Sequence, residues 1–203
     1  MKLYDADYAP SPRRVRMFMA EKGLNDVERI KLDLPKGDNL SEEFAVKNPL
    51  KKVPVLELDD GSCISEAAAI YRYLEETCDG QLLLGETAVE KAVIEMWDRR
   101  IEFAFLVPVF QSFQHGSGIF KDRMTPVPEW ADEARKNAAA FLTILEEGLT
   151  ESTYVAGAAF SAADITAVVT LDFAKVIKLR PGEEHPNILR WYELMKQRPS
   201  YSA

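Results

Sequence analysis

Residues 53–64 read Val-Pro-Val-Leu-Glu-Leu-Asp-Asp-Gly-Ser-Cys-Ile, a pattern typical of two short strands joined by a tight turn. The first half is rich in β-branched and aliphatic residues, and Asp59-Asp60-Gly61 supplies the turn. Immediately after this hairpin, apolar residues between Ala67 and Leu74 recur at i, i+3, i+4 and i+7, so a helix should pack one face on the strands. The segment therefore predicts a ββα unit.

The residues before this unit predict a strand, a helix and a second strand. Residues 2–5 are a strand candidate, and Pro10-Ser11-Pro12 opens a helix whose apolar positions follow a period of 3.6 until Gly23 ends it. We expect Ser11 at the N-cap and Pro12 at the first helical position, where its missing N–H costs nothing. Residues 27–33 then read as a strand. The order βαβ followed by ββα is the thioredoxin-like arrangement.

The pattern changes at residues 79–85, a stretch bounded by glycines. Beyond residue 86, apolar residues repeat at helical spacing and no segment alternates with a period of two. Pro108 should kink or end one of these helices, and residues 160–165 have the form of a capping box with a hydrophobic staple at the start of another. We therefore predict an α/β domain over residues 1–79 and an all-α helical bundle domain over residues 86–203.

Composition narrows the classes of function. The chain has 203 residues and a formal net charge of -8, so as a whole it should repel nucleic-acid phosphates and anionic lipids. No apolar run approaches the roughly 20 residues of a membrane span, and no secretory signal follows Met1, so we expect a cytoplasmic protein without nucleic-acid or membrane partners. Cys63 and Cys78 lack the spacing of a zinc site or a disulfide framework, and no metal is expected.

Three motifs, through their order and separation, resemble the soluble (cytosolic) glutathione S-transferase family. Residues 48–56 are similar to the loop before the family's third strand, residues 66–70 to the motif that starts its third helix, and residues 154–165 to the folding motif of its helical domain. The resemblance covers essentially the whole chain and is to a bacterial-type member. It implies a glutathione-binding thioredoxin-like domain, a helical domain with an apolar site for a second substrate, and a homodimer.

The resemblance implies that the chain conjugates the thiolate of glutathione to small hydrophobic electrophiles, a reaction of detoxification. A thiol with a pKa near 8.5 is only about 3% ionised at pH 7, and lowering that pKa by about two units gives roughly 75% thiolate. Glutathione is then a co-substrate, and no cofactor is expected. Five basic residues are candidates for drawing in this anion: Arg13, Arg14, Arg16, Lys51 and Lys52.

Five residues match positions at which the family binds glutathione: Lys52, Val53, Pro54, Glu66 and Ala67. The resemblance implies a cis bond before Pro54, which would leave the backbone of Val53 free to pair with an extended ligand; from the residues alone, a trans proline on an edge strand is the alternative. Lys52 would meet the glycyl carboxylate, or else be a solvated charge. Glu66 would accept the ligand's ammonium, or only complement the helix dipole. Ala67 stands where the family usually has Ser or Thr, so one hydroxyl contact is lost, although its N–H remains.

Three candidates remain for the group that activates the thiolate. The family places Tyr, Ser or Cys near the start of its first helix, where this chain offers Tyr8 and Ser11. Ser11 is the first choice, although a serine there also fits a simple N-cap, and Tyr8 could instead line the apolar site. The third candidate is the N-terminus of the first helix, assisted through water by His115, although a lone histidine is more often structural.

The hydrophobic substrate site is expected at Phe105, Val109 and Phe113, unless these residues only form the helical core. A glutathione-dependent peroxidase, dehalogenase or isomerase would use the same thiolate. The alternative from another class is a noncatalytic binding or interaction protein on the same fold. Ala67 and the ambiguous Ser11 favour that alternative, whereas Glu66 argues against it because an interaction module needs no contacts to glutathione.

Overall fold

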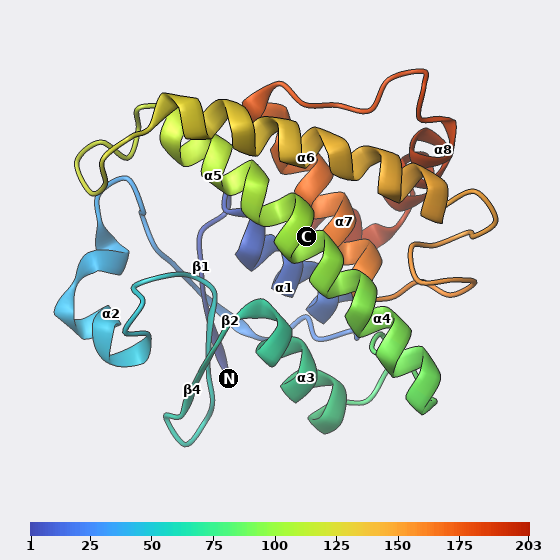
Figure 1. The fold of residues 1–203 in the computed structure, drawn as a ribbon. Coiled ribbons are helices and arrows are strands. Elements are labelled where there is room, and N and C mark those ends of the chain that lie inside the picture. Colours follow the sequence, from blue (N-terminus) through green and yellow to red (C-terminus); the bar gives the residue numbers. More distant parts are fainter. The chain divides into compact units, whose positions relative to one another are not determined.

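The computed structural model describes residues 1–203, which form two compact units (Figure 1). The first comprises residues 1–84 and 199–203, and the second comprises residues 85–198. The last five residues, which the sequence pattern grouped with the helical domain, include a 3-10 helix, η4 (Pro199–Ser202), that packs on α1 (Pro10–Glu21). Arg13 of α1 holds this C-terminal segment in place, because its Nη2 donates a 2.9 Å hydrogen bond to the carbonyl of Tyr201.

A mixed four-stranded sheet in the order β2-β1-β3-β4 organises the first unit. β1 (Lys2–Asp5) pairs in parallel with β2 (Glu28–Lys31) and antiparallel with β3 (Val55–Glu57), and β4 (Cys63–Ser65) closes the hairpin with β3. The parallel pair is joined through α1, as the right-handed crossover of a βαβ unit requires a connecting helix. The thioredoxin-like order predicted from the sequence is confirmed.

The helices of the first unit cover the sheet and place its loops. Phe18 of α1 stacks on Tyr71 of α3 (Ala67–Thr77), with ring centroids 4.4 Å apart. The apolar side chains of Leu3 and Leu56 are completely buried in this unit. The short segments η1 (Asp38–Leu40) and α2 (Glu42–Lys47) lie between β2 and β3, and the Ser41 hydroxyl caps α2 by accepting a hydrogen bond from the N–H of Phe44. The cap stabilises α2, the helix from which the next loop begins.

The second unit is entirely helical. Its helical elements are α4 (Ala88–Ile101), η2 (Glu102–Leu106), α5 (Val107–Gly116), α6 (Pro128–Gly148), α7 (Ala162–Phe173), η3 (Ala174–Ile177) and α8 (Pro186–Lys196). Pro108 was expected to kink or end a helix, but it lies in the first turn of α5 and the helical path continues through it. A π turn, η2, precedes the proline, and its wider spacing lets the helical path continue through a residue that lacks an N–H. None of the helices is both long and apolar enough to span a membrane.

The capping box predicted at residues 160–165 is confirmed, and it anchors the helical core. Asp164 is completely buried, and its carboxylate accepts hydrogen bonds from the N–H groups of Ser161 (3.0 Å) and Val155 (2.9 Å) and from Nε1 of Trp191 (2.9 Å). One carboxylate thus ties the preceding loop, the start of α7 and the buried face of α8 together. Desolvation by burial raises the pKa of Asp164 to about 6.

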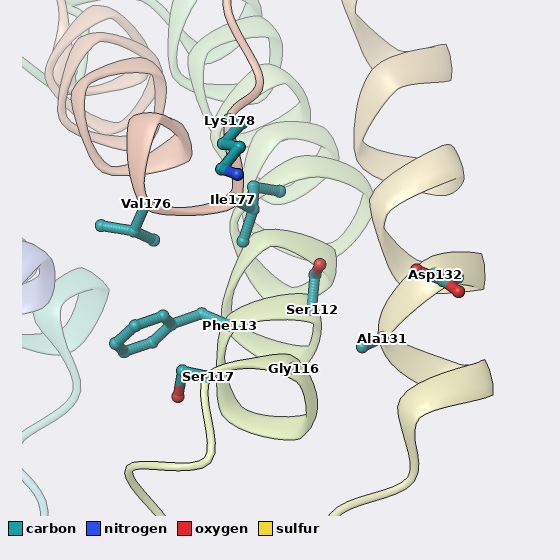
Figure 2. A pocket seen from close by; sticks show the side chains of 9 residues that line it. All are labelled: Ser112, Phe113, Gly116, Ser117, Ala131, Asp132, Val176, Ile177 and Lys178. Atoms are coloured by element: carbon teal, nitrogen blue, oxygen red, sulfur yellow. The ribbon is translucent and has the colours of Figure 1, made fainter.

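A pocket of about 200 Å³ lies in the helical unit between α5, α6 and the turn after η3 (Figure 2).

Candidate functional site

The loop between α2 and β3 is held in shape by two asparagines. Asn48, at the C-cap of α2, is 2% exposed, donates from Nδ2 to the carbonyl of Lys52 (2.7 Å) and accepts at Oδ1 from the N–H of Leu50 (3.0 Å). Asn39 donates from Nδ2 to the carbonyl of Lys51 across 2.6 Å. These bonds stabilise the positive φ of 54° at Lys51 and present the residues that follow it in one conformation.

Val53 and Lys52 lie at the end of this loop, and each has polar groups without a protein partner. The Val53–Pro54 bond is cis, as expected. Val53 precedes β3, and neither its N–H nor its carbonyl bonds to another backbone group. Lys52 is exposed and has no ion-pair partner, whereas Lys51 pairs with Glu42 at 3.1 Å. The loop therefore offers one free backbone edge and one free ammonium.

Glu66 occupies a strained position at the N-cap of α3. Its φ of 68° and ψ of 122° lie in a region that residues other than glycine rarely adopt, at a cost of about 1–3 kcal/mol. The side chain is exposed, does not cap its own helix and forms no hydrogen bond or ion pair. The N–H groups of the first turn, from Ala67 onward, have no acceptor within the helix. A carboxylate and several N–H donors are thus available together at one helix end.

Ser11 lies inside α1 rather than at its cap, so the N-cap prediction is wrong. The helix begins at Pro10, and Ala9 is the N-cap. Pro10 itself suits the first helical position, because its φ is fixed near the helical value and its missing N–H would have no partner there. Ser11 is half-buried, and its hydroxyl forms no hydrogen bond within the protein. The structural role that competed with catalysis is therefore absent, and the hydroxyl is available beside the first turn of the helix.

Tyr8 precedes α1 and is 62% exposed. Partial desolvation, together with the negative charges of Asp33 and Asp38, raises the pKa of Tyr8 above 10.0, so the phenol stays protonated at neutral pH. The protonated phenol can donate a hydrogen bond to a thiolate, but it cannot act as the base that removes the thiol proton.

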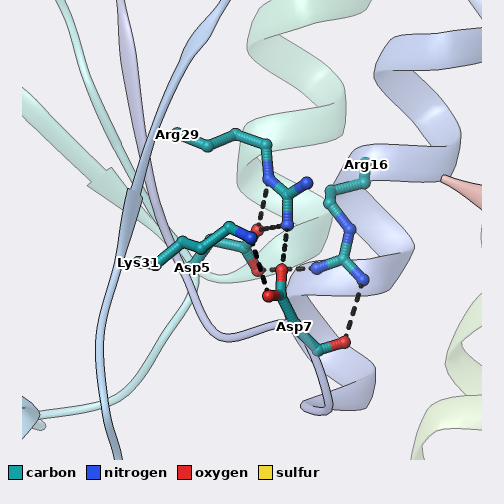
Figure 3. A network of polar contacts seen from close by, with 5 residues as sticks. All are labelled: Asp5, Asp7, Arg16, Arg29 and Lys31. Atoms are coloured by element: carbon teal, nitrogen blue, oxygen red, sulfur yellow. Dashed lines mark hydrogen bonds and ion pairs between the residues drawn. The ribbon is translucent and has the colours of Figure 1, made fainter.

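Five charged side chains brace the loop that carries Tyr8 and leads into α1 (Figure 3). Asp5, fully buried at the end of β1, accepts from Nη1 of Arg16 (2.6 Å) and Nε of Arg29 (2.7 Å). Arg16 also donates from Nη2 to the carbonyl of Asp7 (3.2 Å), and the Asp7 carboxylate accepts from Arg29 (2.6 Å) and Lys31 (2.8 Å). The ion pairs with Lys31 and Arg29 lower the pKa of Asp7. The loop is fastened at Asp7 from two elements.

This network changes the expectation for the basic residues. Arg16 is 8% exposed and paired with Asp5, so it is not a surface charge that draws in an anion. Arg14 is 1% exposed and lies over the ring of Tyr71, and Arg13 binds the C-terminal segment. Sequence spacing placed these arginines near the helix start, but the direction of each side chain depends on partners far along the chain. Among the five candidates, Lys52 has no protein partner.

His115 has a structural contact in the helical unit. Its Nδ1 accepts a hydrogen bond from the N–H of Val127 across 3.1 Å, which ties the end of α5 to the segment before α6. The proton of a neutral His115 therefore sits on Nε2. His185 has a similar role, because its Nδ1 accepts from the N–H of Gly182 at 3.3 Å.

The three residues expected to contact a hydrophobic substrate divide into two groups. Phe105 and Val109 are fully buried, and Phe105 stacks on Phe141 of α6 with centroids 5.5 Å apart, so the core alternative describes them and neither has surface to offer. Phe113 is half-buried and meets Phe120 and Phe173, each at 5.5 Å between centroids. Phe173, which closes the apolar stripe of α7, was not among the candidates because an apolar stripe signals core and site alike.

Comparisons with known proteins match both units. The family model described as "Glutathione S-transferase, N-terminal domain" matches residues 8–77, and "Glutathione S-transferase, C-terminal domain" matches residues 128–194. Glutathione S-transferase 2 of Saccharomyces cerevisiae is 39% identical over 203 residues, which cover 98% of this chain and 87% of that protein. The crystal structure of Gtt2 from Saccharomyces cerevisiae has a TM-score of 0.94 at 38% identity and covers 99% of this chain and 98% of that chain.

A relative with a different name also matches. Probable elongation factor 1-gamma 1 of Arabidopsis thaliana is 30% identical over 192 residues, which cover 90% of this chain but only 45% of that protein. The likeness therefore extends to less than half of a longer protein.

Proposed function

Because the chain belongs to the glutathione S-transferase family, we propose that it conjugates the thiolate of glutathione to small hydrophobic electrophiles, a reaction of detoxification. The observation that carries the proposal is the unpaired Glu66, held at positive φ beside the free N–H groups of α3. The register that pairs Val55 with Ser65 brings Val53 and the start of α3 to the same end of the hairpin. Strained backbone of this kind clusters at functional sites, and an exposed carboxylate without a partner adds nothing to the stability of the fold itself.

An extended tripeptide matches these groups from end to end. The ammonium of its γ-glutamyl part pairs with Glu66, and the adjacent carboxylate accepts from the first-turn N–H groups, beginning at Ala67. The cysteinyl part pairs with the backbone of Val53, as in strand addition. The glycyl carboxylate meets Lys52, whose ammonium has no protein partner. No metal or further cofactor takes part in this scheme.

Ser11 is the group we propose as the thiolate stabiliser. Lowering the thiol pKa by about two units requires about 2.7 kcal/mol. A hydrogen bond to a charged group contributes about 1.5–3 kcal/mol, and a helix N-terminus adds about 0.3–1 kcal/mol, so a free hydroxyl on the first turn of α1 meets the requirement. Tyr8 is the second candidate, weakened by its exposure to water. His115 is the third, with only Nε2 left to act.

The second substrate requires an apolar surface, which we assign to Phe113 with its neighbours Phe120 and Phe173. Their edge-to-face contacts hold the rings without burying Phe113.

We also propose a homodimer, supported by a stripe of exposed apolar side chains on α4 and η2. In this stripe Val89, Met96 and Phe103 recur every seven residues and are 73%, 38% and 64% exposed. The cytoplasmic location expected from the sequence stays a prediction.

A noncatalytic glutathione-fold binding protein is the second candidate. Two observations favour it: Ala67 lacks the hydroxyl usual in the family, and one relative at 30% identity is named an elongation factor subunit rather than a transferase. A peroxidase, dehalogenase or isomerase would keep the glutathione site and differ only in the second substrate.

The decisive experiment is calorimetric titration with glutathione, combined with ultraviolet absorbance of the bound thiolate from about pH 5 to 9. We expect binding with a lowered thiol pKa in the wild type and in the control Ser62→Ala, and a pKa restored toward its ordinary value in Ser11→Ala. Glu66→Gln should bind glutathione at least about tenfold more weakly. Absence of binding at millimolar glutathione would leave the interaction protein, and an unchanged thiol pKa in Ser11→Ala would transfer the role to Tyr8 or His115.

A further inference from the structure

The pocket of the helical unit lies outside the residues assigned to glutathione. It opens between the end of α5, the first turns of α6 and the turn after η3 (Figure 2), and all the residues that line it belong to the second unit. Phe113 forms part of one wall, but its partners Phe120 and Phe173 do not line the pocket. The pocket is therefore complete within one unit and shares only Phe113 with the aromatic cluster.

One wall carries a hydroxyl without a protein partner. Ser112 of α5 is 6% exposed, lines the pocket and forms no hydrogen bond within the protein. In Figure 2 its side chain points from α5 toward the turn that carries Ile177 and Lys178. The hydroxyl is available to a molecule that occupies the pocket.

Two opposite charges also border the pocket, and neither is neutralised by the protein. Lys178 and Asp132 both line the pocket, are exposed, and form no ion pair with each other or with a third residue. Lys178 is carried on a braced turn: its φ is 56°, and Arg135 of α6 donates to the carbonyls of Ile177 (3.0 Å) and Lys178 (3.2 Å). The positive and the negative charge thus come from different elements at one opening.

Apart from Ser117, the remaining surface is apolar and small in scale. Phe113, Val176 and Ile177 supply the apolar walls, and Gly116 faces Ala131 so closely that a Cβ at residue 116 would lie 3.3 Å from the Ala131 methyl group. The volume of about 200 Å³ is below the lower limit of about 300 Å³ for pockets that hold drug-sized ligands. The occupant is therefore a small molecule.

We propose that this pocket binds a small zwitterion of the amino-acid type with an apolar side chain. The carboxylate pairs with the Lys178 ammonium and accepts a hydrogen bond from the Ser112 hydroxyl, the ammonium faces Asp132, and the side chain packs on the apolar walls. A ligand with a single charge would satisfy only one of the two opposite charges. The proposal does not depend on the binding of glutathione, because no residue assigned to glutathione takes part.

Titration calorimetry of the whole chain tests the proposal with three matched probes. L-Phenylalanine carries both charges, 3-phenylpropanoate lacks the ammonium, and phenethylamine lacks the carboxylate. We expect L-phenylalanine to bind at one site per chain with a Kd of about 1 mM, and each single-charge probe at least about tenfold more weakly. Lys178→Gln, Asp132→Asn and Ser112→Ala should each weaken the binding of L-phenylalanine, the two charge variants by about tenfold. In Asp132→Asn, 3-phenylpropanoate should bind no more weakly than in the wild type.

Lys136→Gln is the matched control, since Lys136 is exposed on α6 one turn from Asp132, pairs only with Glu133 and does not line the pocket. It should leave binding unchanged. Titrations repeated with glutathione at saturation, and with Glu66→Gln, separate this pocket from the glutathione site. Loss of L-phenylalanine binding in either would overturn the proposal, as would equal binding of all three probes or no saturable heat up to about 20 mM. Thermal unfolding of each variant confirms that weaker binding does not come from unfolding.

Discussion

The Nδ2 of Asn48 donates a 2.7 Å hydrogen bond to the carbonyl of Lys52, four residues further along the chain. The same buried side chain accepts from the N–H of Leu50, so one amide closes the loop that presents Lys52 and Val53. This places an anchor for the proposed glutathione contacts at a residue that does not itself touch the ligand.

Replacing Asn48 with Ala should loosen this loop. Two hydrogen bonds of a buried amide are lost, so we expect the KM for glutathione to rise about tenfold while kcat changes little. Steady-state kinetics with glutathione varied at fixed electrophile measures this. Asn25→Ala, at an exposed asparagine of the same unit, is the control. A fall in kcat with an unchanged KM would contradict the role of Asn48 as a positioning residue.

Arg16→Met should destabilise the first unit strongly. The substitution keeps much of the apolar stem, but it leaves the buried Asp5 carboxylate with Arg29 alone and releases the carbonyl of Asp7. Breaking a buried ion pair typically costs about 3–5 kcal/mol. Urea unfolding gives the change in free energy. Lys31→Gln, which alters only the exposed rim of the same network, should unfold like the wild type; similar losses in both variants would refute the central place of Arg16.

Glu146 should make stability depend on acid pH. Burial opposes its charge, but hydrogen bonds from the N–H groups of Asn187 (3.0 Å) and Ile188 (2.9 Å) at the start of α8 lower its pKa below 4.5. A lowered pKa in the folded state means that the stabilisation is present above about pH 4.5 and is lost as the pH falls through the folded-state pKa. Glu146→Gln should lose about 1 kcal/mol at pH 7, typical of a helix cap, and approach the wild type in acid. Denaturant unfolding at several pH values measures this, with the exposed Glu147→Gln as control; a gap that widens in acid would show the wrong sign.

Asp164 should act in the opposite direction. Its pKa is raised from 3.8 to about 6 by burial, so the folded state binds the proton more tightly than the unfolded state. The stability that this group contributes is complete below about pH 3.8 and falls by about 3 kcal/mol as the pH rises to about 6. Asp164→Asn should be less stable throughout, because it cannot accept all the bonds that the carboxylate accepts, and should lack this slope. A variant with the wild-type slope between about pH 4 and 6 would assign that slope to other groups.

Residue patterns predicted the architecture well because each pattern acts over a short range. The turn at Asp59-Asp60-Gly61, the helical period after Ala67 and the capping box at Ser161 each involve neighbours along the chain, and all three are found in the structure. The cis bond before Pro54 was expected from the resemblance and is also present. Ser11 shows the limit of local reasoning, because two prolines compete for one helix start and Pro10 takes it.

The candidate site divides in the same way. Lys52, Val53 and Glu66 followed from motifs that keep their spacing along the chain, and their roles toward glutathione stay predictions. Burial decided the other residues: Arg16 is neutralised by Asp5, eleven residues away, and Phe105 is covered by Phe141 of another helix. Apolar and basic side chains have the same sequence pattern whether they face a ligand or the core.

The sequence by itself determined the order of strands and helices and the identity of the family, because hydrophobic period, turn chemistry and motif spacing are properties of neighbouring residues. Tertiary structure alone decided which polar groups remain unpaired. Ser11 and Ser112 are both serines in helices, yet only the packing of the folded chain shows that each hydroxyl lacks a partner and that Ser112 borders a pocket. The reason is physical: a hydrogen bond or an ion pair is formed by groups that meet in space, and their separation along the chain carries little information about that meeting.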